Sequence, residues 1–156
     1  MSKKITIHPA AIRDQKAIIK LLFRVGLQRL LTGPNAMQPD KCLVARNINT
    51  VVGLTAWRSI HRQACHSLAT VVRQDHQRSG IARALVIEKY RRLYDMGVRH
   101  VTVSTDNPVV IDWLKRKFAY RVVGRRKKHG EIGRPRVQHW TDMAVDLESI
   151  REVIHG

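Results

Sequence analysis

The feature that most constrains this chain is a short polar loop between a predicted strand and a predicted helix. The run Ala64–Val72 is rich in β-branched and small apolar residues, which favours a buried strand. The segment 77–82, QRSGIA, then leads into a helical pattern. The first N–H groups of a helix have no acceptor within it and lie at the positive end of its dipole. Because Gly80 has no Cβ to block a ligand, the sequence predicts a site suited to a pyrophosphate.

Hydrophobic periodicity predicts the other elements and their order. A first helix is expected after Asp14, a favourable N-cap residue, and is expected to continue to Thr32. Further helices are expected from the loop to Gly97, from Pro108 to Phe118, and from Glu148. Strands are predicted at Ile5–His8, Cys42–Arg46, Val51–Ile60, Ala64–Val72, His100–Ser104, Tyr120–Arg125 and His139–Leu147.

Size and composition are typical of one globular domain. With 156 residues and 44% apolar residues, the chain is long enough to bury a sizeable core. The start, MSKKITIHPA, lacks the apolar core of a signal peptide, and no apolar run is long enough to span a bilayer. A cytoplasmic location is therefore expected, with Cys42 and Cys65 as free thiols.

The charge is strongly positive. There are 29 Lys and Arg against 12 Asp and Glu, a formal net charge of +17. Such a basic protein attracts polyanions, so nucleic acid, an acidic protein and a high-salt or acidic habitat are all open explanations. The densest cluster, Arg125–Lys128 followed by Arg134 and Arg136, is either a solvated hairpin loop or a polyanion contact.

The loop and the order of elements resemble a known family. The pattern Gln/Arg-x-x-Gly-x-Gly/Ala between strand and helix resembles the acetyl-CoA loop of the GCN5-related N-acetyltransferase (GNAT) superfamily. Asp106-Asn107 before a helix, and the run Phe118–Gly124 after it, resemble the family's Asn-led helix and its Leu-Gly-Phe-x-x-x-Gly finish. The resemblance implies an α/β (α+β) GNAT fold over residues 1–156 as a single domain. Its central sheet would be mixed, mostly antiparallel and twisted, with helices on both faces and two splayed strands holding the CoA arm.

By this resemblance the cosubstrate is acetyl-CoA, and no His, Cys or acidic spacing suggests a metal. The pantetheine arm would lie along the strand before the loop, and the loop's N–H groups would hold the pyrophosphate, with Asn107 also near the cofactor arm. The residues implied for the strand are Leu68, Ala69, Thr70, Val71 and Val72. Those implied for the loop are Gln77, Arg78, Ser79, Gly80, Ile81, Ala82 and Arg83.

The implied reaction is direct attack of an amine on the thioester, for which the amine loses a proton and the thiolate gains one. Many relatives use a Tyr on the Asn-led helix as the acid, but Leu114 or Lys115 stands there. Tyr120 is a candidate acid or a core residue, and Asn107 a cofactor ligand, a water ligand or a helix cap. His66 is a candidate base or a structural residue, and Ser67 a candidate proton relay.

Other polar residues are less informative. His76 is expected to face solvent or phosphate, and His139 and Trp140 border the acceptor pocket or merely end a strand. The carboxylates Asp40, Glu131 and Asp142 are each able to attract a cationic amine.

The acceptor stays open among a small amine or amino acid, a protein N-terminus or Lys, and an aminoacyl-tRNA. The net charge favours an anionic acceptor, although no RNA-binding motif is recognisable and only 5% of residues are aromatic. The alternatives to an N-acetyltransferase are a nucleic-acid-binding module and a CoA-sensing module, each without turnover. A homodimer is possible because dimers are common in the superfamily.

Overall fold

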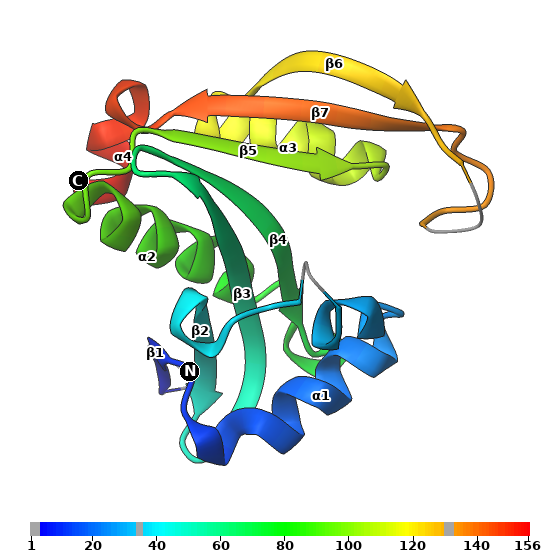
Figure 1. Cartoon of the computed structure of the whole chain (residues 1–156). Coiled ribbons are helices and arrows are strands. Elements are labelled where there is room, and N and C mark those ends of the chain that lie inside the picture. The colour runs from blue at the N-terminus through cyan, green and yellow to red at the C-terminus, as the bar shows by residue number, and fades with distance from the viewer. Residues whose placement is uncertain (1–3, 34–35, 130–132) are drawn as a thin grey trace. The chain divides into compact units, whose positions relative to one another are not determined.

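The computed structural model describes residues 4–33, 36–129 and 133–156, and Figure 1 shows its helices and strands. The chain divides into two compact units. The first comprises Met1–Arg58 and Leu68–Arg92, and the second Ser59–Ser67 and Leu93–Gly156. A single domain over residues 1–156 stays a prediction.

The first unit contains an antiparallel set of strands with helix α1 (Gln15–Arg24) against it. Strand β1 (Ile5–Pro9) pairs with β2 (Cys42–Asn47), which pairs with β3 (Thr50–His61). The second half of β4 (Ala64–Val72) belongs to the same unit. The core joins Ile18, Leu21 and Leu22 of α1 to apolar side chains of the strands, among them Val44, Leu54, Ala56 and Val71.

Helices cover both faces of the sheet in the first unit. Successive side chains of a strand point to opposite faces, so Gly53 and Leu54 of β3 mark the two sides. Leu54 packs in the core with α1. A Cβ placed on Gly53 would lie 3.2 Å from the Leu85 side chain, which belongs to helix α2 (Ile81–Asp95). Glycine at this position therefore allows α2 to approach the strand closely.

The first helix is shorter than the sequence predicts. Helix α1 ends at Arg24, and Gly26 follows with φ of 74°, a left-handed conformation that ends the helix. The leucines beyond it lie around a short 3₁₀ helix, Gln28–Leu31, whose Leu30 still reaches the core. Apolar spacing alone does not reveal this break, because the pattern continues across it.

The second unit is built on strands β5, β6 and β7. The start of β4 pairs in parallel with β5 (His100–Thr105), from Ala64–His100 to Ser67–Val103. Strand β5 pairs antiparallel with β7 (His139–Asp146), which pairs antiparallel with β6 (Arg121–Lys127). The strand order is thus β1-β2-β3-β4-β5-β7-β6, a mixed and mostly antiparallel sheet, which confirms the expected fold class.

The second unit has one helix between β5 and β6 and another after β7. Helix α3 (Pro108–Phe118) ends at Ala119, which has φ of 54°. The chain closes with a 3₁₀ turn, Leu147–Ile150, and helix α4 (Arg151–His155). Strand β6 runs two residues further than predicted, because Arg126 and Lys127 pair with Trp140 and His139 of β7. Much of the basic cluster is therefore strand and not loop.

Candidate functional site

The loop before α2 contains two residues with a left-handed backbone conformation. A 3₁₀ turn, Gln74–His76, leads into it from β4, and Arg78 and Gly80 have positive φ values of 61° and 83°. Left-handed residues of this kind are common in turns whose N–H groups bind anions, and the resemblance implies the pyrophosphate of acetyl-CoA at this loop. The N–H of Ala84 donates to the carbonyl of Gly80 at 3.0 Å. Donors earlier in the helix have no acceptor within it.

The space beside Gly80 is open. A Cβ built there meets no described atom within 4 Å, and Gln77, Arg78 and Ser79 are exposed. The Ser79 hydroxyl donates to the carbonyl of His76, and the Gln77 amide donates to the carbonyl of Val72 at 3.1 Å. The loop is therefore held by its own hydrogen bonds while the space next to Gly80 stays open for a ligand.

The strand before the loop is held from one side. Leu68 and Ala69 pack partly against the core of the first unit, and Val71 and Val72 are buried. The Thr55 hydroxyl lies 3.3 Å from the carbonyl of Ala69. The described pairing of β4 with β5 stops at Ser67–Val103, although both strands continue. This is the stretch for which the resemblance implies the pantetheine arm.

A polar row crosses the strands of the second unit. His66 of β4 lies opposite Thr102 of β5, with Nδ1 2.7 Å from the threonine hydroxyl. Two residues along, Ser104 donates to Asp142 of β7 at 2.7 Å. Alternation along each strand places these side chains on one face, opposite the buried Val101 and Met143 neighbours. The candidate base thus stands within a hydrogen-bonded polar face.

Asp142 gives this face its negative charge. Arg126 of β6 donates to both carboxylate oxygens, with Nε to Oδ2 at 2.7 Å and Nη2 to Oδ1 at 3.0 Å. The hydrogen bond from Arg126 lowers the pKa of Asp142 against the opposing effect of burial, and Ser104 and the charge of His66 act in the same direction as Arg126. Arg126 already occupies both oxygens of this carboxylate in a forked pair. Asp142 is therefore less available to pair with a cationic amine, the role expected for it from the sequence.

The other catalytic candidates have structural partners or surroundings. The side chain of Asn107 accepts a hydrogen bond from the N–H of Val109 at 3.0 Å, which caps helix α3. Tyr120 is 4% exposed and follows the end of that helix. Leu114, where many relatives have a Tyr, is buried, and the neighbouring Lys115 is exposed. Ser67 is also buried, at the last described pair between β4 and β5.

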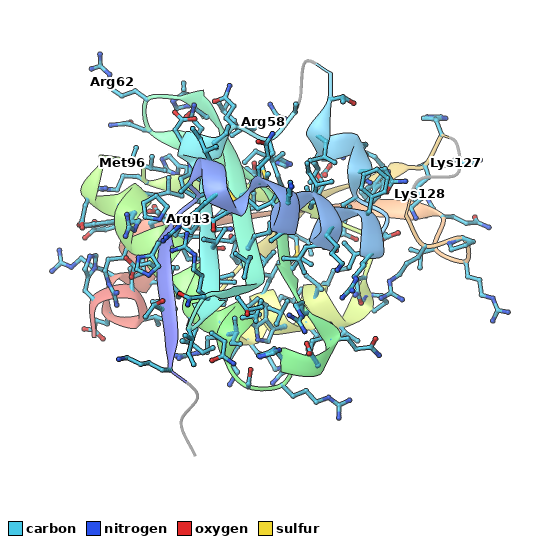
Figure 2. All side chains as sticks on the ribbon, turned by 90° about the horizontal axis from the view of Figure 1, so that it is seen from below. Arg13, Arg58, Arg62, Met96, Lys127 and Lys128 are labelled. Atoms are coloured by element: carbon cyan, nitrogen blue, oxygen red, sulfur yellow. The ribbon has the colours of Figure 1, made fainter. Side chains whose placement is uncertain are left out.

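Asp106 ties the start of α3 to the segment after β6. The Lys128 ammonium lies 2.5 Å from its carboxylate and 4.7 Å from the centre of the Trp140 ring, and the Arg134 N–H also donates to Asp106. Burial opposes the charged form, but Lys128 and the Arg134 amide together lower the pKa of Asp106. In Figure 2, Lys127 and Lys128 are labelled together at this end of β6. The basic cluster therefore has two parts: exposed residues of strand β6, and Lys128 in a largely buried ion pair with Asp106.

The remaining expected residues fall in different places. His76 does not face solvent: its side chain is 10% exposed, with Nδ1 2.8 Å from Asp75 and Nε2 3.3 Å from the Asn47 amide. The solvent-facing alternative is thus wrong because the turn at Gln74–His76 directs the ring toward β2, while the phosphate alternative stays a prediction. Asp40, Arg83 and His139 are exposed, and Trp140 is half-buried. Glu131 lies outside the described residues.

The sequence profile of the acetyltransferase (GNAT) family matches residues 16–120, about two thirds of the chain. The chain belongs to this family. The matched region runs from α1 through the loop at Gly80 to the end of α3. The membership confirms the expected superfamily and the class of enzyme, an acetyltransferase.

Solved structures agree with the fold of this acetyltransferase. Ard1 from Thermoplasma volcanium is 14% identical, with a TM-score of 0.74 over 91% of this chain and 97% of that one. The ribosomal-protein-S18-alanine N-acetyltransferase of Escherichia coli is 15% identical, with a TM-score of 0.72 over 92% and 94%. The putative acetyltransferase yncA of Salmonella typhimurium, solved with acetyl-CoA, is 16% identical, with a TM-score of 0.72 over 92% and 94%. No curated protein matches the sequence significantly.

Three further observations concern the described residues. Cys42 and Cys65 are both buried and form no disulfide, as expected. No group of three or more His, Cys, Asp or Glu side chains is placed to hold a metal ion within residues 4–33, 36–129 and 133–156. In the same part of the chain, no helix is both long and apolar enough to cross a membrane.

Sequence reasoning missed some polar residues of this acetyltransferase. Thr102 and Ser104 alternate with valines in the run His100–Thr105, and that alternation was the available signal for a polar face. Lys89 is 1% exposed on α2. Because Lys89 lies four residues after the buried Leu85, the sequence indicates that it lies on the apolar side of the helix. The sequence does not indicate that a lysine there is almost fully buried.

Proposed function

We propose that this acetyltransferase binds acetyl-CoA at the loop Gln77–Arg83 and along Leu68–Val72, and transfers the acetyl group to an amine. One observation carries the proposal: Arg78 and Gly80 hold the loop in a left-handed turn at the start of α2, with open space beside Gly80. A diphosphate suits this place because the N–H groups and the helix dipole both favour negative charge. Arg78 and Arg83 add positive charge at the exposed edge of the loop.

The transfer needs no covalent enzyme intermediate. The amine nitrogen attacks the thioester carbonyl, a C–N bond forms, and the C–S bond breaks to release the CoA thiolate. The amine must lose a proton, and the thiolate takes one.

We assign the role of base to His66, through its place on the polar face of the second unit. The Thr102 hydroxyl lies 2.7 Å from Nδ1 of His66 and orients the ring. The carboxylate of Asp142 stands on the same polar face, and the charge of His66 is one of the causes that lower the pKa of Asp142. Ser67 is proposed as a relay, and Tyr120 and Asn107 stay candidates of lower rank because the first is buried and the second caps α3.

The acceptor class is tested with the enzyme itself. The family match favours an enzyme over a nucleic-acid-binding or CoA-sensing module. Nuclease-treated protein is incubated with acetyl-CoA and, separately, with small amines and amino acids, with peptides that have free N-termini or Lys, and with aminoacyl-tRNA. Thiol release is followed together with acetylated product by mass spectrometry. Stoichiometric thiol and acetylated amine are expected with one acceptor class, and thiol release that never exceeds hydrolysis in any arm contradicts amine transfer.

Peptides that begin with Ala are a sensible first choice within the protein arm, since the Escherichia coli structure above is named for such an acceptor. The net charge of +17 supports an anionic acceptor. A cytoplasmic location and a homodimer remain predictions from the sequence and the resemblance.

A further inference from the structure

A second pocket lies in the first unit, apart from the loop at Gly80. Its volume is about 860 Å³, and strand β1, helix α1, the turn between β2 and β3, and Arg73 line it. We call this space the α1 pocket. No residue of the segment 77–83 lines it. Its volume falls in the range of about 300–1,000 Å³ that is usual for small-molecule sites.

The lining of the α1 pocket is strongly basic. Five guanidinium or ammonium groups line it, from Arg13, Lys20, Arg24, Arg46 and Arg73, against the one lining carboxylate of Asp14. Figure 2 labels Arg13 where the chain enters α1.

Ion pairs account for only two of these cations. Arg46 binds Asp14, and Arg73 binds the exposed Asp75 at 2.6 Å. Among the described residues, no carboxylate lies within ion-pair distance of Lys20 or Arg24, so the pocket carries excess positive charge.

The pocket has one buried polar wall. The side chains of Arg46 and Asp14 are 8% and 3% exposed, and Arg46 Nη2 lies 2.5 Å from Asp14 Oδ2. The N–H of Ala11 donates to the same carboxylate at 2.9 Å. These bonds fix the wall, whereas Lys20 and Arg24 are exposed at the rim. The arrangement is a hydrogen-bonded buried wall with exposed cations at the edge of the pocket, which suits capture of an anion from solvent.

The helix presents its cations here through its periodicity. Ala17, Lys20, Leu21 and Arg24 of α1 line the pocket, and their spacings of three, one and three place them on one side of the helix. Arg13 lines it from the 3₁₀ turn just before α1. Ala17 and Leu21 supply apolar surface, and Thr6, Asn49 and Thr50 supply polar groups. The lining therefore offers a place for phosphate next to an organic body.

We propose that the α1 pocket binds a small phosphorylated organic molecule with at least two negative charges. Guanidinium and ammonium groups together favour phosphate, because Arg binds its oxygens in a fork and Lys adds a point charge. The site is additional to the acetyl-CoA loop and so goes beyond the proposed function.

The test uses the full chain, with ribose 5-phosphate and inorganic pyrophosphate as probes and ribose as the uncharged control. Binding is followed by calorimetry and by backbone amide shifts. Saturable binding of both probes is expected, with shifts at α1 and the β2–β3 turn and none with ribose. Removal of both rim charges, Lys20→Gln with Arg24→Gln, should weaken binding at least tenfold. The matched control, Arg29→Gln with Arg58→Gln, removes two exposed charges that do not line the pocket and should change binding less than twofold.

The decisive arm repeats the titration with saturating acetyl-CoA. Unchanged probe affinity and unchanged shifts at α1 support a separate site. Loss of the probe's amide shifts at α1 on addition of acetyl-CoA, equal losses in the two double variants, or shifts confined to the segment 77–83 would each overturn the proposal. Binding of the probe does not require that acetyl-CoA binds. The titration would therefore still test the α1 pocket if the proposed function were wrong.

Discussion

Asp14 and Arg46, 32 residues apart in the sequence, form a forked ion pair that joins the start of α1 to β2 inside the first unit. The Arg46 Nε lies 3.2 Å from Oδ1 and Nη2 lies 2.5 Å from Oδ2. Asp14 stands at the N-cap position that the sequence predicts, but its side chain makes no cap hydrogen bond to the helix. The carboxylate turns to Arg46 and to the N–H of Ala11 instead.

Removal of one partner of this pair should destabilise the protein strongly. Asp14→Ala leaves the Arg46 charge buried without its carboxylate, a change that typically costs about 3–5 kcal/mol. Urea unfolding measures the loss in the free energy of unfolding. The matched control is Asp75→Ala, which breaks the exposed pair with Arg73 and should change stability little. Equal effects of the two substitutions would show that the buried pair is not a stabilising contact.

The same pair should make stability depend on pH in acid. Burial alone would raise the pKa of Asp14, but hydrogen bonds from Arg46 and Ala11 outweigh it and lower the pKa. A lowered folded-state pKa adds stability above the unfolded value of about 3.9, and this is lost as pH falls through the folded pKa. The difference in unfolding free energy between wild type and Asp14→Asn should thus be constant from about pH 7 to 5 and shrink below about pH 4. A difference that grows in acid would contradict the assignment.

Cys42 should be chemically inert in the folded protein. Burial raises the pKa of its thiol to about 12, and the charge of Asp14 acts in the same direction. At pH 8 the thiolate is then a fraction of about one in ten thousand, so alkylation is slow. Iodoacetamide followed by peptide mass spectrometry should find Cys42 unmodified in native protein and modified in urea. Rapid native labelling of Cys42 would show that this part of β2 opens readily.

His66→Gln should reduce turnover and leave acetyl-CoA binding intact. Loss of a general base typically lowers kcat by about 10²–10⁴-fold. The rise of rate with pH on the acid limb should also disappear in the variant. His100→Gln, which changes an exposed histidine on the neighbouring strand, is the matched control. A kcat within twofold of wild type for His66→Gln would remove His66 from the mechanism.

Much of the fold could be predicted from the sequence because local residues mark where helices and strands begin and end. Strand Ala64–Val72 and helix Pro108–Phe118 have the predicted bounds. A turn precedes the strand, and the helix begins at a proline and ends at the left-handed Ala119. Helix α1 was predicted too long because its apolar spacing continues past Gly26. The left-handed conformation of the loop at Gly80 was also predictable, since a glycine in the local sequence encodes it.

Side-chain contacts between strands that are distant in the sequence could not be predicted from the sequence. Asp142 lies beside Ser104 and Arg126 only because β5, β7 and β6 are neighbours in a particular register. A one-residue shift would place the carboxylate on the opposite face. The buried place of Asp106 beside Lys128 has the same origin. Pairings of this kind are set by the tertiary fold and leave no local signal.

The most direct test of the account is calorimetric titration of nuclease-treated protein with acetyl-CoA, for wild type, Gly80→Val and Gly97→Val. Both glycines have positive φ, 83° and 96°, and open space at the Cβ position, so the two substitutions impose similar strain. That strain costs about 1–3 kcal/mol for a non-glycine residue, and circular dichroism verifies that both variants fold.

Saturable one-site binding in wild type and in Gly97→Val, lost in folded Gly80→Val, is the result that the account predicts. Unchanged acetyl-CoA affinity in Gly80→Val, or no binding by wild type, would contradict the placement of acetyl-CoA at this loop.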